Sequence, residues 1–187
     1  MKPHFEMFAG YNAWANRRLY EAAATLSEGQ YRQDRGAFFK SMHGTLNHLL
    51  VGDRVWMHRF TGEGTPPARL DLILFEDLAS LRSAREAEDK RIVHWVSSLE
   101  EERLAGFIRY RRVTGNKEQV EQPLAPALSH FFNHQTHHRG QAHAILTGFG
   151  KRDLELDLLY YQREAGMAAG SACQSRNRSR RIACAAP

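Results

Sequence analysis

Apolar side chains recur every three to four positions over four long stretches of the chain, a spacing that places them on one face of an α-helix. The predicted long helices cover about 3–26, 41–60, 75–104 and 126–150. The second meets the run TGEGTPP, whose Gly and Pro residues end a helix, and the fourth begins at Pro126, a favourable first-turn residue. The pattern predicts an all-α fold: an up-and-down four-helix bundle with short connections.

Between the third and fourth predicted helices the pattern changes. FIRYRRV and KEQVEQ flank a Thr-Gly-Asn tripeptide at 114–116, whose residue types favour a turn, so we predict a small β-hairpin before the last long helix. The polar stretch SEGQYRQDRG, after the first helix, is expected to be a connection. A brief helix over about 156–164 ends the predicted domain, residues 1–165.

Residues 166–187 differ in composition from the rest of the chain. They include four arginines, both cysteines and no acid: Arg176, Arg178, Arg180, Arg181, Cys173 and Cys184. The tail therefore supplies four of the five net positive charges, and the Gly/Ala/Ser-rich sequence around them is typical of disorder. We expect a disordered basic tail, no disulfide framework and no nucleic-acid partner, because a basic face that binds DNA should belong to the folded domain.

The remaining composition is that of an ordinary globular protein. Hydrophobic residues make up 42% and charged residues 25% of the chain, so one domain with a real core is expected. We find neither an apolar run of about 20 residues nor the basic-then-apolar order of a secretory signal at the start. The expected location is the cytoplasm, with no membrane partner.

Histidines are unusually frequent in the fourth helix, where five of the ten lie between His130 and His143. The apolar stripe of this helix consists of Leu124, Leu128, Phe131, Ala142, Ile145 and Phe149. His138 falls near the middle of that stripe and His134 about 40° to one side. Two imidazoles one turn apart can chelate one ion, but buried histidines that hydrogen-bond the backbone are also common. The pair alone leaves both interpretations open.

The second helix offers a third candidate ligand, His48, with Gly44 and Gly52 one turn before and after it. Glycine inside a helix costs about 1 kcal/mol relative to alanine. The glycines either keep space open beside His48 for an ion and a substrate, or allow close helix packing. His43 and His58 point elsewhere on the helical wheel and are expected to be solvated or capping.

Asp53 lies about 140° away from His48 on the same wheel. A buried ion pair with Arg17 or Arg139 is therefore expected rather than a contact near the metal. Gln141 shares the face of His138, where it would contact a bound substrate or make a hydrogen bond inside the bundle.

Other chemistries lack their motifs. The predicted domain has no Cys pair, no HExxH, no Glu-x-x-His, no GxSxG and no P-loop, which argues against a zinc finger, a zincin protease, a di-iron bundle, a serine hydrolase and a P-loop NTPase. A mononuclear three-histidine site is the design that remains.

Two motifs resemble the DinB family of bacterial proteins, which is unrelated to the DNA polymerase of that name. They are FFKSMHGTLNHLLVGDRVW in the second helix and SHFFNHQTHHRGQ in the fourth. The resemblance implies a four-helix bundle that binds a divalent ion through His48, His134 and His138. It also implies a homodimer and, from a few relatives, chemistry on low-molecular-weight thiols.

Three imidazoles would leave positions on the ion open for water or a small-molecule substrate, as in catalytic sites. They suit Zn²⁺, Ni²⁺, Fe²⁺ or Cu²⁺ without choosing among them. The expected function is a metal-dependent enzyme of the thiol transferase or hydrolase type. The alternative is a non-catalytic bundle that the metal stabilises, acting as a dimeric binding or stress-response protein.

Overall fold

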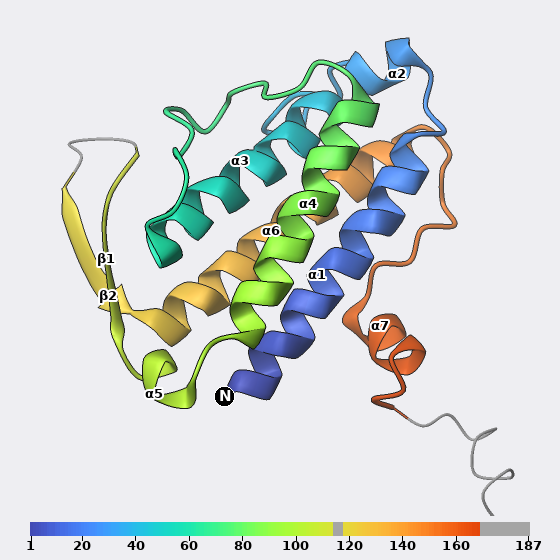
Figure 1. The fold of residues 1–187 in the computed structure, drawn as a ribbon. Coiled ribbons are helices and arrows are strands. Elements are labelled where there is room, and N and C mark those ends of the chain that lie inside the picture. Colours follow the sequence, from blue (N-terminus) through green and yellow to red (C-terminus); the bar gives the residue numbers. More distant parts are fainter. Residues whose placement is uncertain (114–117, 169–187) are drawn as a thin grey trace, which may run out of the picture. The chain divides into compact units, whose positions relative to one another are not determined.

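The computed structural model describes residues 1–113 and 118–168, which are mostly helical with one small antiparallel sheet (Figure 1). Its contacts divide the chain into two compact units. The first is Met1–Leu154, and the second begins at Glu155 and contains α7 (Leu158–Glu164). From residue 169 onward, the predicted disordered tail lies outside the described residues. In the described ranges, no helix is both long and apolar enough to cross a membrane.

Four long helices form where the hydrophobic spacing predicts them. They are α1 (Lys2–Ala23), α3 (Met42–Thr61), α4 (Leu78–Ser97) and α6 (Leu124–Gly148). The ends of α3 have local causes: the Ser41 hydroxyl accepts from the Gly44 backbone N–H, and Gly62 takes a left-handed φ of 75°. The third helix is shorter than predicted, since it stops at Ser97 and a separate turn of helix, α5 (Glu101–Leu104), follows.

A further short helix, α2 (Glu28–Arg32), lies in the stretch expected to be a connection. Ser27 and Gln30 form a capping box at its start. The Ser27 hydroxyl accepts from the Gln30 backbone N–H at 3.2 Å, and the Gln30 side chain accepts from the Ser27 N–H at 3.0 Å. The S-x-x-Q spacing in the sequence was the signal for this helix.

The predicted hairpin consists of β1 (Phe107–Arg111) paired antiparallel with β2 (Gln119–Pro123). Its expected turn, residues 114–116, lies outside the described residues. The second strand leads directly into α6, and the Leu124 N–H donates to the Gly106 carbonyl at 2.9 Å. The hairpin is therefore closed by the first residue of α6.

The direction of the long helices differs from the predicted up-and-down order. Residues later in α3 contact residues later in α4: Asp53 pairs with Arg85, and Phe60 stacks on Trp95. These helices therefore run parallel, where alternating order would make them antiparallel. The cause is the connection of residues 62–77, which is long and returns beside α3, so both helices start at the same end (Figure 1). Each long helix packs against two others, because α1 and α3 both contact α4 and α6.

The core has two apolar clusters with a polar layer between them. The cluster at the hairpin end includes Phe5, Trp56, Ile92 and Phe131. The cluster at the α2 end includes Leu19, Leu46, Leu81 and Ile145. Buried polar side chains lie between these clusters along every long helix: Asn12, Asn16, Asp53, Arg85, Asp89, Gln135 and Arg139. Such groups are costly to bury without partners, so their mutual hydrogen bonds decide how the helices meet.

Candidate metal centre

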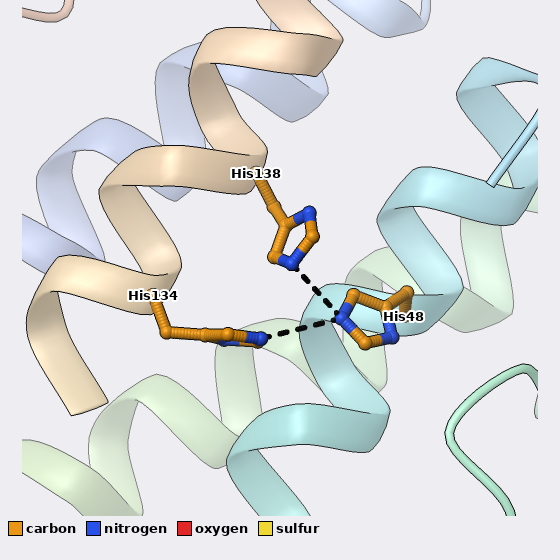
Figure 2. A group of neighbouring side chains, drawn as sticks. All are labelled: His48, His134 and His138. Carbon is orange, nitrogen blue, oxygen red and sulfur yellow. Dashed lines mark hydrogen bonds between the residues drawn. The ribbon is translucent and has the colours of Figure 1, made fainter. Parts of the chain in front are cut away.

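Three histidines from two facing helices meet between α3 and α6 (Figure 2). His48 comes from α3, and His134 and His138 lie one turn apart on α6. His48 Nε2 is 3.2 Å from His138 Nε2 and 3.4 Å from His134 Nε2. Two nitrogens bound to one tetrahedral zinc ion are separated by about 3.3 Å, so the spacing fits a shared small cation. Within residues 1–113 and 118–168, this is the one group of His, Cys, Asp or Glu side chains found close enough to hold a metal.

Further hydrogen bonds fix the protons on two of these rings. His48 Nδ1 lies 2.8 Å from the Leu70 carbonyl oxygen, and His138 Nδ1 lies 2.8 Å from Gln141 Oε1. A carbonyl oxygen can only accept, so both Nδ1 atoms carry the proton and, in the neutral rings, both Nε2 atoms are acceptors. In that state neither of these facing Nε2 atoms can donate to the other. A cation between them removes the repulsion, and an outer acceptor on the opposite nitrogen is typical of metal-bound histidine.

Burial keeps the three rings neutral. It lowers the pKa of His48 to about 4 and that of His134 to about 3, and it also lowers the pKa of His138. Neighbouring imidazoles repel the charged forms of His48 and His134 further, while the Leu70 hydrogen bond partly offsets the shift of the His48 pKa. At pH 7 the rings are therefore in the neutral form, in which one ring nitrogen has a lone pair that can bind metal.

Phe39 covers one face of His48. The two ring centroids are 3.6 Å apart and the planes differ by 16°, and the same phenyl ring meets His138 edge to face at 5.5 Å. Gly44 permits this contact, because a Cβ at that position would lie 2.2 Å from the Phe39 carbonyl oxygen. Gly44 thus serves close backbone packing. Nothing in the sequence pattern singled out Phe39.

Gly52 makes room for a candidate ligand. A Cβ at position 52 would lie 3.0 Å from His134 Cε1 and 3.5 Å from His134 Nδ1. The sequence leaves two interpretations of these glycines open: space beside His48 for an ion and a substrate, or close packing. The structure favours close packing, because Gly44 admits the Phe39 backbone and Gly52 admits the His134 imidazole.

Asp53 is buried, as the helical wheel suggests, but its partner is neither Arg17 nor Arg139. Asp53 Oδ2 lies 2.6 Å from Arg85 NH1 of α4. Burial raises the pKa of Asp53, and the Arg85 guanidinium opposes that shift by stabilising the carboxylate. The partner follows from the parallel course of α3 and α4, which brings Arg85 of α4, rather than an arginine of α1 or α6, beside Asp53.

The Asp53 carboxylate also holds α6 in place. Its Oδ1 accepts a hydrogen bond from Gln135, which stands between the two candidate ligands of that helix and also donates to the Leu49 carbonyl at 3.1 Å. The network continues through Arg85 to Asp89, then to Asn12 and Asn16 of α1, and from these to Arg139 of α6. Two carboxylates and two guanidiniums balance in charge, so this layer joins all four long helices beside the histidines.

The two other histidines of α3, His43 and His58, lie outside the candidate metal centre. His43 is not solvated: it is 7% exposed, and its Nε2 is 3.1 Å from the Phe75 carbonyl oxygen, because residues 62–77 return over it. His58 Nδ1 lies 3.2 Å from the Glu63 carbonyl just beyond the end of α3, as expected for a capping role. Gln141, through its contact with His138, makes a hydrogen bond within the protein.

A helical fold that directs three neutral imidazoles at one point defines a class: helical proteins with a candidate three-histidine metal site. The described residues add no fourth His, Cys, Asp or Glu to the group. The family model for the DinB family matches residues 1–176, and the chain belongs to that family. It is similar to Protein DinB of Bacillus subtilis (strain 168), with 27% identity over 159 residues that cover 81% of this chain and 89% of that protein. The membership indicated by the two histidine motifs is confirmed.

Proposed function

We propose that this protein is a metal-dependent enzyme that binds one divalent ion through His48, His134 and His138 and acts on a small molecule beside it. The observation that supports this is the approach of three Nε2 atoms, two of which hydrogen bonds keep as acceptors. Structural zinc is usually closed by four protein ligands, whereas three leave a position for water or substrate. When bound, a divalent ion supplies Lewis-acid chemistry that lowers the pKa of a nearby water or thiol.

The chain's own residues prepare the donors in this proposal. Leu70 and Gln141 hold the Nδ1 protons of His48 and His138, so both rings present a lone pair without rearranging. Phe39 shields one face of His48 from water. The ion would therefore meet preorganised ligands, which favours tight and geometrically specific binding.

The substrate class that we propose is a low-molecular-weight thiol, and it rests on the family resemblance. The test is to load the full chain separately with Zn²⁺, Ni²⁺ and Fe²⁺ and to measure consumption of cysteine or glutathione with an electrophile. Turnover that needs metal and disappears in His138→Ala is expected. A large fall in melting temperature on chelation, with no turnover for any thiol or for hydrolysable esters, would instead favour the non-catalytic, metal-stabilised alternative.

We also propose that the four long helices form one bundle and that two copies of the chain associate through it as a homodimer. This proposal rests on the family resemblance. Sedimentation velocity of the full chain at several concentrations tests the assembly. A monomer at every concentration would exclude the dimer while leaving the metal site untouched.

A further inference from the structure

Arg59, near the end of α3, lies against two aromatic rings and has no acidic partner among the described residues. Its Cζ lies 4.4 Å from the ring centroid of Trp56 and 4.2 Å from that of Tyr110 on β1. These two rings meet edge to face, with centroids 5.6 Å apart. The Arg59 Nε is buried and finds no hydrogen-bond partner in the described part of the chain. Cation–π contact therefore stabilises the guanidinium while part of its donor rim is left unsatisfied.

The charged side chains close to Arg59 are mostly basic, and Glu121, which lines a neighbouring cavity with Arg59, is paired with Arg109. Burial lowers the pKa of Arg59, with Arg112 adding to the shift and Tyr110 opposing it. A partly enclosed cation beside a second arginine is unfavourable unless an anion compensates it.

A cavity of about 460 Å³ opens beside this arginine. Its walls include His58 and Arg59 of α3, Pro67 of the long connection, and Tyr110 and Arg112 at the hairpin. None of the described residues that line it is acidic. Its volume lies within the range of roughly 300–1,000 Å³ typical of small-molecule sites.

We propose that this cavity binds the carboxylate or phosphate group of a small molecule, received by the N–H rim of Arg59. The Arg59 Cζ lies over the ring faces of both Trp56 and Tyr110, and Arg59 lines the cavity, so its terminal N–H groups are the donors that a ligand in the cavity would meet. A planar fork of N–H donors matches two oxygens of a carboxylate or phosphate. Arg59 follows His48 by eleven positions on one helix, an axial rise of about 16 Å, so the anion site is distinct from His48 and does not rest on the proposed metal chemistry.

The test uses full-length, metal-free protein labelled with ¹⁵N and titrated at constant ionic strength. Inorganic phosphate and succinate are the two probes, and NMR follows the arginine Nε–H and tryptophan indole signals. We expect saturable shifts at Arg59 and Trp56 with a dissociation constant of about 1 mM. The probe that saturates first identifies whether phosphate or carboxylate is preferred.

Arg59→Met is expected to weaken saturable binding at least about tenfold, because it keeps an apolar stem against the rings but removes the charge. Arg54→Met is the matched control. Arg54 lies on the same helix and over a ring, 5.7 Å from the Phe75 centroid, but has Glu88 at 4.0 Å. Linear shifts at Arg59 without saturation, or equal losses in both variants, would overturn the proposal. If Arg59→Met does not fold, the wild-type titration decides, since saturation must map to the Arg59 and Trp56 signals. Because no metal is present, failure here and failure of the proposed enzyme activity are separate results.

Discussion

Replacing Gly52 with alanine is expected to weaken metal binding while destabilising the metal-free protein by no more than about 2 kcal/mol. Glycine in a helix interior costs about 1 kcal/mol relative to alanine, so the substitution favours α3 by that amount. The new Cβ would lie 3.0 Å from His134 Cε1. Ordinary carbon–carbon contact is about 3.5–4.0 Å, so the imidazole must move by a few tenths of an ångström or more. Overpacking of this kind costs about 1–3 kcal/mol, which leaves a net destabilisation of the metal-free protein of at most about 2 kcal/mol.

The gain in helix propensity does not offset the effect on metal binding, since propensity acts on folding alone. The displaced His134 Nε2 would no longer meet the other two nitrogen donors. A loss of about 10–100-fold in affinity is expected, as for changes to groups that orient metal ligands. Competition with a chromophoric chelator measures the zinc affinity, and urea unfolding measures the metal-free stability.

Gly140→Ala on α6 is the control for that experiment, since a Cβ at position 140 meets nothing within 4 Å. It should gain up to about 1 kcal/mol of stability and bind zinc as the wild type does. If Gly52→Ala folds and binds zinc as tightly as Gly140→Ala, the argument that Gly52 makes room for a ligand is refuted.

Three further predictions follow from the same geometry. Elemental analysis after dialysis should find one divalent ion per wild-type chain and none in His138→Ala; equal stoichiometry would remove this histidine from the ligand set. Arg85→Met leaves the Asp53 and Asp89 carboxylates buried without their guanidinium, so urea unfolding should show a loss of about 3–5 kcal/mol; a loss under about 1 kcal/mol would show that the layer contributes little. The pKa of His48 lies near 4 in the folded chain but near 6.5 in the unfolded one. From pH 6.5 down to 4 the unfolded state therefore binds one more proton at this ring than the folded state does. The stability of the metal-free protein should fall over that range by about 1.4 kcal/mol per pH unit because of His48. His48→Ala should have a shallower slope, and identical slopes would contradict the assignment of a neutral buried ring.

The four long helices could be located from the sequence because their apolar spacing is long and regular. Two candidate ligands could be found for a related reason, because His134 and His138 stand on the apolar stripe of α6, where an unpartnered imidazole needs an explanation. His48 is singled out instead by Gly44 and Gly52 on the same helix face and by the family resemblance. The structure brings these rings together, with one nitrogen of each within 4.8 Å of the others.

What the sequence could not supply depends on chain direction and on backbone atoms. Pairing Asp53 with Arg85 requires α3 and α4 to run parallel, and helical periodicity carries no information about direction. The Leu70 contact comes from a main-chain oxygen, which has no signature in residue type. Phe39 reaches His48 only because the preceding segment packs closely on Gly44, a tertiary contact that no local pattern encodes.

The long connection between α3 and α4 is anchored to α3 at two neighbouring points. The Leu70 carbonyl meets His48, and the backbone N–H groups of Leu74 and Phe75 donate to Asn47 Oδ1 at 2.8 and 3.1 Å. Every residue type has the same backbone carbonyl, so substitutions at position 70 should leave the hydrogen bond to His48 Nδ1 unchanged. The number of residues between the two anchors is constrained, because deleting or inserting one residue would place a different peptide group beside the His48 ring. When homologous chains are aligned, a gap between positions 70 and 74 should therefore be more informative about the metal centre than any change of side chain there, and a loop graft should be cut before position 70.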